Sequence, residues 1–217
     1  MRMIRGVLFD FDGVIVQSEP LHMRTFMEIL APYGVHVSQD RWYREFAGTG
    51  SRSIFERLAR EYKVPDPIDE LVERRKILYE KYVRSGMLNT TIGIRDFLAS
   101  LKKERIKRAI VSGSHRTNVE LALSIFGLGE FFDIIVSGDD TEFRKPDPGA
   151  FLYAAKKIGL TPAECVVIED SVAGAEAARR GGMKLIAVKS PALHQLGRYD
   201  LAIDDFLDFD VKTLQEI

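Results

Sequence analysis

The sequence predicts an α/β fold: a doubly wound parallel-sheet core of the Rossmann-like type with an inserted α-helical cap domain. Two observations lead to this prediction. Short apolar runs alternate with helical patterns along most of the chain, and residues 18–86 interrupt that alternation with helical patterns alone. We expect the core to comprise residues 1–16 and 88–217, and the cap residues 17–87.

The expected strands are apolar on consecutive residues, as a sheet buried on both faces requires. Such runs occupy residues 6–9, 108–111, 134–136, 166–168 and 185–188. The later runs are separated by helical patterns long enough for ordinary crossovers. Parallel strands joined by helices are therefore expected.

The cap is expected because residues 10–107 lie between the first two runs, whereas an ordinary crossover needs about a dozen or two. Apolar residues in this stretch recur at helical spacing. Three groups show it: Leu21 to Leu30, Ile54 to Tyr62, and Leu71 to Tyr82. Pro65-Asp66-Pro67 is expected to break the chain between two cap helices.

Charge and composition exclude several classes of protein. Lys and Arg (31) nearly balance Asp and Glu (32), so no net field attracts nucleic acid or a membrane surface. Acidic residues interrupt the N-terminal segment before a secretory apolar region could form. Cys165, the single cysteine, lies in an apolar run and is expected to be a buried structural thiol. We expect a cytoplasmic protein, with a monomer as the default state.

Asp10 and Asp12 follow the first expected strand, and Gly13 allows a sharp turn after them. Ligands of open α/β sheets bind at the carboxyl ends of the strands. One acid can then act as nucleophile and metal ligand while the other transfers a proton. The alternative is an ordinary β-turn at Asp12-Gly13.

Two further strand ends carry groups that suit a phosphate. Ser112 and the following backbone N–H groups, beginning at Gly113, could bind phosphate oxygens, or Ser112 could cap a helix that begins near Arg116. Lys145 could neutralise phosphoryl charge, or could be a solvated loop lysine ahead of Pro148.

Glu169 and Asp170 end another expected strand. Their hard oxygen ligands suit Mg²⁺, which a substrate phosphate oxygen and waters would complete. Asp170 or Ser171 could also cap the following helix, and both interpretations can hold together.

These four strand ends, in their order along the chain, resemble the motifs of the haloacid dehalogenase-like superfamily. The resemblance covers essentially the whole chain. The matching residues are Asp10-Phe11-Asp12-Gly13, Ser112, Lys145-Pro146, Glu169-Asp170, Ser171-x-x-Gly174 and Arg180-Gly181-Gly182-Met183. The resemblance implies that Asp10 forms an aspartyl-phosphate and that Asp12 first protonates the leaving oxygen and then activates water. It implies that Ser112 and Lys145 hold the transferring group. The implied Mg²⁺ ligands are Asp10, the backbone carbonyl of Asp12, Asp170, and Glu169 directly or through water.

The insertion site resembles the helical-cap subclass and its branch of sugar phosphatases and β-phosphoglucomutases. Gln17 stands where an aspartate is common in that branch. The details of the hinge between core and cap are therefore left open. His22 is expected to orient substrate or the cap, or to be a surface or hinge residue. Arg52, in the loop that starts at Gly48, could bind the distal part of a substrate or could lie in solvent behind a helix capped by Ser51.

The predicted function is that of a magnesium-dependent phosphatase, a phosphoric monoester hydrolase acting on a small molecule such as a sugar phosphate or phosphoglycolate. A β-phosphoglucomutase-type mutase is the alternative. The spacing of Gly48 and Arg52, wider than in such mutases, favours the hydrolase. A non-catalytic phospholigand-binding protein is disfavoured because a binder does not need a general acid beside a nucleophile.

Overall fold

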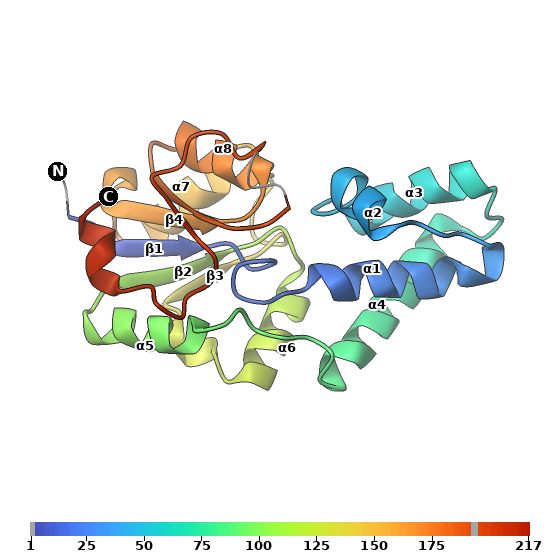
Figure 1. Cartoon of the computed structure of the whole chain (residues 1–217), viewed down its shortest axis with the longest axis horizontal. Coiled ribbons are helices and arrows are strands. Elements are labelled where there is room, and N and C mark those ends of the chain that lie inside the picture. Colours follow the sequence, from blue (N-terminus) through green and yellow to red (C-terminus); the bar gives the residue numbers. More distant parts are fainter. Residues whose placement is uncertain (1–2, 192–194) are drawn as a thin grey trace. The chain divides into compact units, whose positions relative to one another are not determined.

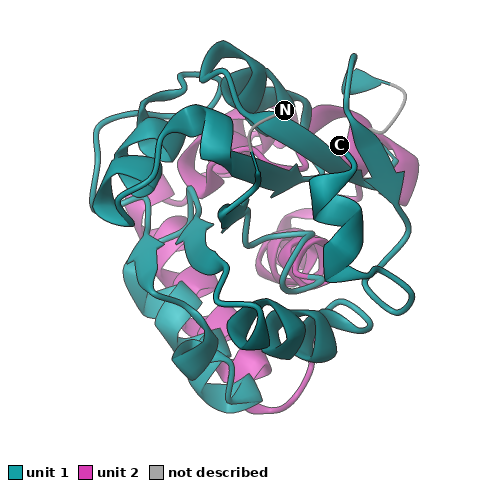
Figure 2. Cartoon of the chain, turned by 90° about the vertical axis from the view of Figure 1, so that its left-hand side faces the viewer, with its two compact units in different colours: residues 1–17, 90–217 teal, residues 18–89 magenta. Residues whose placement is uncertain are grey.

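The computed structural model describes residues 3–191 and 195–217. The chain divides into two compact units, residues 1–17 with 90–217 and residues 18–89 (Figure 2). The first is called the α/β unit and the second the helical unit. These boundaries lie one or two residues from the expected ones.

The α/β unit contains a six-stranded sheet in the order β3-β2-β1-β4-β5-β6, with every neighbouring pair parallel. The strands are β1 (Gly6–Phe9), β2 (Lys107–Val111), β3 (Ile134–Val136), β4 (Cys165–Glu169), β5 (Lys184–Val188) and β6 (Leu201–Ile203). The five expected runs form β1 to β5. Phe9 pairs with Ile110 on one side and with Ile168 on the other, so the polar residues after these three strands meet at one edge.

Helices cover both faces of the sheet (Figure 1). One face carries α5 (Ile94–Lys103) and α6 (Arg116–Phe126), and the other carries α7 (Gly149–Lys157) and α8 (Val172–Arg180). Alanines of α7 and α8 pack against buried strand residues such as Leu8 and Val167. Their small side chains allow helix and sheet to approach closely. The predicted doubly wound class is confirmed.

Strand β6 was not expected from the sequence. Its three residues are only partly buried, and it pairs with β5 at the edge of the sheet. Leu201-Ala202-Ile203 is an apolar run of only three residues between two aspartates, so its strand pattern is weak. Cys165 lies fully buried in β4, and burial raises the pKa of its thiol to about 12, which suits a structural role.

The helical unit consists of α1 (Glu19–Leu30), α2 (Gln39–Glu45), α3 (Ser51–Tyr62) and α4 (Ile68–Arg84). Its core includes Phe26, Trp42, Phe55 and Leu71, all almost fully buried. Helix α4 begins directly after Pro67, where the sequence predicts a break. Short 3₁₀ helices are η1 (Ala31–Tyr33), η2 (Gly129–Phe131), η3 (Pro162–Glu164) and η5 (Val211–Gln215). Over residues 3–191 and 195–217, no helix is both long and apolar enough to cross a membrane.

The two chain segments that lead to and from the helical unit pair with each other within the α/β unit. Val16 and Thr90 form an antiparallel bridge, and the N–H of Thr91 donates to the carbonyl of Ile15 at 3.0 Å. The Gln17 amide donates to the Thr91 hydroxyl at 2.8 Å. The chain therefore leaves and re-enters the α/β unit through two paired segments.

Candidate active site

A partly buried lysine lies between two buried carboxylates at the carboxyl edge of the sheet. Asp10 follows β1 directly, and its N–H donates to the carbonyl of Ile168 at 2.9 Å, which extends the pairing of β1 with β4. The Lys145 ammonium donates to Asp10 Oδ1 at 2.6 Å and to Glu169 Oε1 at 2.5 Å. Asp10 is 7% exposed and Glu169 is fully buried. Lys145 is therefore held between two carboxylates and is not a solvated loop lysine.

Both oxygens of Glu169 are engaged. Oε1 accepts from Lys145, while Oε2 accepts from the N–H groups of Asp170 and Ser171, each at 2.8 Å, and from the Ser171 hydroxyl at 2.9 Å. A Cβ on Gly174 would lie 1.7 Å from Glu169 Oε1, so a larger residue cannot occupy that position without displacing the carboxylate. Glu169 is thus fixed by the first turn of α8. Ser171 also caps this helix by accepting from the N–H of Gly174, as one interpretation of the sequence predicts.

The carboxylates of Asp10, Glu169 and Asp170 offer oxygen atoms within 4.8 Å of one another. Such a donor set fits a hard divalent cation. Gly13 adopts a φ of 83°, and a Cβ there would lie 2.2 Å from Asp170 Oδ2. The turn after Asp12 therefore needs glycine, both for its left-handed backbone and for the room it leaves Asp170.

Burial and like charges shift the acid pKa values upward. Burial is the main cause that raises the pKa of Asp10, to about 7; the charges of Glu169 and Asp12 act in the same direction, and the attraction of Lys145 opposes them. Burial, followed by the charges of Glu169 and Asp10, raises the pKa of Asp170 well above its ordinary value. For Lys145, burial alone would lower the pKa, but the charges of Asp10 and Glu169 outweigh it and raise the pKa. Near neutral pH the lysine is charged, and a bound cation would favour ionised acids.

The loop after β2 brings hydroxyl groups to the same edge. Ser112 is buried, and its hydroxyl accepts from the N–H of Ser114 at 3.0 Å. Helix α6 begins at Arg116 with His115 at its N-cap, so the suggested helix cap at Ser112 is wrong. Gly113 is exposed between the two serines. The Ser114 hydroxyl donates to Asp12 Oδ2 at 2.6 Å.

Two predicted binding residues, His22 and Arg52, belong to the helical unit. The His22 ring stacks on Tyr79 with centroids 4.8 Å apart, and its Nδ1 lies against the guanidinium of Arg75. The Arg52 side chain is 57% exposed and forms an ion pair with Asp69. Their roles toward a substrate stay predictions.

Arg75 was not singled out from the sequence. It is 8% exposed and donates to the hydroxyl of Ser51 at 2.8 Å. Ser51 is the first residue of α3 and Gly50 is the N-cap, so the suggested cap at Ser51 is wrong. One signal could have found Arg75. Arg75 lies four residues after Leu71 and four before Tyr79, on the apolar face of its helix.

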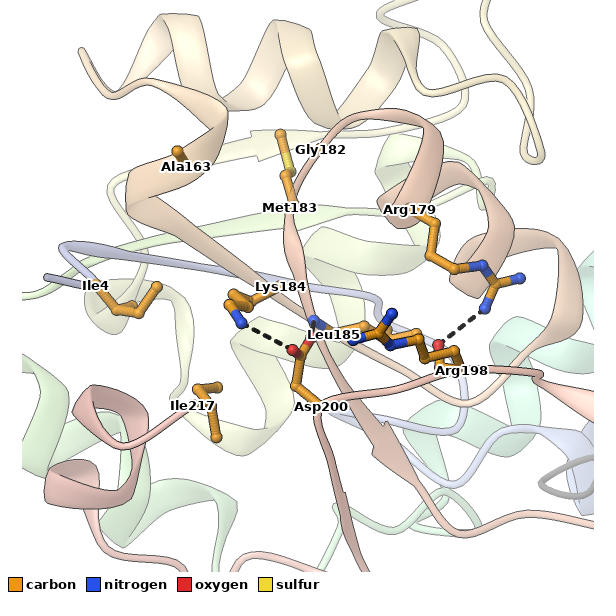
Figure 3. A pocket seen from close by; sticks show the side chains of 10 residues that line it. All are labelled: Ile4, Ala163, Arg179, Gly182, Met183, Lys184, Leu185, Arg198, Asp200 and Ile217. Atoms are coloured by element: carbon orange, nitrogen blue, oxygen red, sulfur yellow. Dashed lines mark hydrogen bonds and ion pairs between the residues drawn. The ribbon is translucent and has the colours of Figure 1, made fainter. Parts of the chain in front are cut away.

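A separate cavity of about 500 Å³ opens at the opposite, amino-terminal edge of the sheet (Figure 3). Two of its cations are already engaged. Lys184 pairs with Asp200 at 2.9 Å, and Arg179 donates to the carbonyl oxygens of Leu196 and Arg198 at 2.6 and 3.1 Å. The cavity is remote from Asp10, so we do not assign the chemistry to it.

A family model described as haloacid dehalogenase-like hydrolase matches residues 7–188. The chain belongs to the haloacid dehalogenase-like hydrolase family. This confirms the predicted family. The lysine between two carboxylates is therefore found in a chain that belongs to a family of hydrolases.

Curated members of the family include phosphatases. The chain is 30% identical to a phosphorylated carbohydrates phosphatase of Thermotoga maritima, with 84% of each chain covered. It is 38% identical over 191 residues to the protein SUPPRESSOR OF QUENCHING 1 of Arabidopsis thaliana, covering 86% of this chain but only 18% of that protein. The predicted enzyme class, a phosphoric monoester hydrolase, agrees with the phosphatase names.

Solved structures of the family share the fold. CbbY from Rhodobacter sphaeroides in complex with phosphate matches with a TM-score of 0.86 and 27% identity, over 99% of this chain and 100% of that chain. β-Phosphoglucomutase from Clostridium difficile matches with a TM-score of 0.83 and 23% identity, over 99% and 96%. The second likeness establishes the fold alone.

Proposed function

We propose that this enzyme is a magnesium-dependent phosphatase that hydrolyses a small phosphorylated metabolite through an aspartyl-phosphate on Asp10. The observation that carries the proposal is the buried ion-pair system in which Lys145 contacts both Asp10 and Glu169. A partly buried cation beside a nucleophilic carboxylate offsets the charge that a phosphate dianion brings into the site.

Asp10 is the proposed nucleophile, and Asp12 the proposed acid that protonates the leaving oxygen and then the base that activates water. Ser112, the N–H of Gly113 and Lys145 are proposed to hold the transferring phosphoryl group. Arg52 and His22 are proposed to contact the organic part of the substrate.

Asp10, the backbone carbonyl of Asp12, and Asp170 are proposed to bind the cation. Bound Mg²⁺ supplies positive charge that lowers the repulsion between these carboxylates and a phosphate. Glu169 has both oxygens engaged by Lys145 and by the start of α8, which supports an indirect contribution to the metal site. We propose that it positions Lys145 and reaches the cation through water.

We propose a sugar phosphate as the first substrate class to test, because the relative from Thermotoga maritima is named for phosphorylated carbohydrates. The fold is shared with a β-phosphoglucomutase, so the fold does not separate hydrolase from mutase. The two differ in whether water or a second sugar phosphate accepts the phosphoryl group.

The test is a phosphate-release assay on sugar phosphates and phosphoglycolate, run beside chromatography for isomerised sugar phosphate. Each reaction is run with Mg²⁺ or chelator, and with or without glucose 1,6-bisphosphate. We expect stoichiometric phosphate release that needs Mg²⁺, shows no stimulation by the bisphosphate, and is abolished by Asp10→Asn. Isomer formed faster than phosphate, and only with the bisphosphate, would identify a mutase. Binding of these compounds without any turnover would identify a phospholigand-binding protein.

A further inference from the structure

The Ser114 hydroxyl contacts the proposed acid and base of the reaction. It donates to Asp12 Oδ2 at 2.6 Å, although 102 positions separate the two residues. This distance is typical of a hydroxyl that donates to a charged carboxylate, a stronger interaction than one between neutral groups. The hydrogen bond joins the loop after β1 to the loop after β2.

The main chain fixes Ser114 on both sides. Its N–H donates to the Ser112 hydroxyl at 3.0 Å, and its carbonyl accepts from the N–H of Gly138 at 2.9 Å. The N–H of Ser112 in turn donates to the carbonyl of Val136 at 2.9 Å, which continues the pairing of β2 with β3. The sheet therefore determines where the main chain of Ser114 lies, next to Asp12.

A hydroxyl held in this way limits rotation of the Asp12 carboxylate. A general acid must present its proton within hydrogen-bonding distance of the leaving oxygen, and small misplacements are costly in rate. We infer that Ser114 is a positioning residue that aims Asp12 at the leaving group. The inference rests on the proposed function of Asp12.

A purely structural role for Ser114 makes a different prediction. If the hydrogen bond only tied two loops together, its loss would slow every substrate equally. A positioning role for the acid affects only substrates whose leaving group needs a proton. The constant kcat/KM reports this step, because it covers events up to transfer of the phosphoryl group to Asp10.

The experiment compares 4-nitrophenyl phosphate with 4-nitrobenzyl phosphate, which have similar shapes. Nitrophenolate is a weak base and departs unaided, whereas the benzyl alkoxide needs a proton. We expect Ser114→Ala to lower kcat/KM for the benzyl ester by about 10-fold or more and for the phenyl ester by less than about 3-fold. Ser114→Thr, which keeps the hydroxyl, should restore the benzyl reaction. Ser100→Ala, which removes a remote hydroxyl on α5, should change neither. Equal losses for both esters, or no loss, would overturn the inference.

A second measurement does not depend on turnover. Crystal structures of the wild type and of Ser114→Thr should show Asp12 in the same rotamer. A crystal structure of Ser114→Ala should show Asp12 in a different rotamer. An unmoved Asp12 in Ser114→Ala would refute the positioning role. If the wild type hydrolyses neither ester nor any sugar phosphate, the proposed function is wrong. The rotamer of Asp12 in the variants would then still show whether Ser114 positions Asp12.

Discussion

The Lys145 ammonium lies 2.6 Å from the Asp10 carboxylate, although 135 positions separate the two residues. Glu169, at 2.5 Å, holds the same ammonium from the other side. One ammonium group thus forms ion pairs with two buried carboxylates. The ionisation of each group depends on the others, so the site responds to charge changes in ways that stability and activity measurements can separate.

Removal of Lys145 should destabilise the protein in a pH-dependent way. Lys145→Met leaves Asp10 and Glu169 buried without their cation, so we expect a loss of about 3–5 kcal/mol in the free energy of unfolding near pH 8. Near pH 5 the loss should be smaller, because Asp10, whose pKa is about 7, is then protonated and no longer needs the lysine. Urea unfolding at both pH values measures this, with the exposed Lys156→Met on α7 as control. A loss that does not depend on pH would contradict the buried ion-pair account.

Asp10 should make the metal-free protein less stable as pH rises. Burial raises its pKa from 3.8 to about 7, so between these values the folded state holds a proton that the unfolded chain releases. Stability from this group is therefore full below about pH 4 and is lost by about pH 7, on the order of 4 kcal/mol.

Asp10→Asn does not titrate and should flatten that pH dependence. Urea unfolding in chelator, from about pH 4 to about pH 8, compares the two proteins. Asp170 titrates in both proteins, so the difference between the curves reports Asp10 together with its effect on Asp170. Parallel curves would show that the pKa of Asp10 is not raised in the folded protein.

Asp170 should govern the magnesium requirement. Asp170→Asn removes a carboxylate that neighbours Asp10 and Glu169, so we expect the Mg²⁺ concentration for half-maximal phosphate release to rise by about 10-fold or more. Calorimetric titration with Mg²⁺ checks the same change without turnover. Asp208→Asn, at an exposed carboxylate, is the matched control. An unchanged Mg²⁺ affinity in Asp170→Asn would remove this residue from the metal site.

Gly13 should be needed for space as well as for its backbone conformation. Gly13 and Gly86 have φ values of 83° and 81°, but a Cβ would meet Asp170 Oδ2 at 2.2 Å in the first case and no atom within 4 Å in the second. Both alanine variants should lose about 1–2 kcal/mol of stability through backbone strain. Only Gly13→Ala should also weaken Mg²⁺ binding, measured by calorimetry. Equal effects of the two substitutions on Mg²⁺ binding would show that strain alone matters.

Much of the fold could be predicted because burial on both faces leaves a direct pattern in the sequence. Strand β1 has four buried residues, so its apolar run predicts where the strand lies and that it is covered on both faces. Strand β6 and helix α2 were not predicted. The first is a partly buried edge strand, and the second is a helix of seven residues with a single buried side chain, Trp42.

The site could be predicted as a set of strand ends, but not as a set of contacts. The spacing of Glu169 and Asp170 places both at one strand end, yet only the tertiary structure reveals that Lys145 and the start of α8 occupy both Glu169 oxygens. The hydrogen bond from Ser114 to Asp12 links segments far apart in sequence and leaves no local pattern.

The hydrogen bond between Gln17 and Thr91 joins the two chain segments at which the helical unit is inserted. We call this pair of segments the junction. Because the outgoing and returning segments are already paired at Val16 and Thr90, the sheet closes its own chain there. The entropy of closing the intervening loop grows only slowly with its length, so the junction can carry an insertion of almost any size at little thermodynamic cost. A short turn in place of residues 18–89 would preserve every pairing of the parallel sheet. The same junction could therefore accept a different inserted unit without a redesign of the α/β unit.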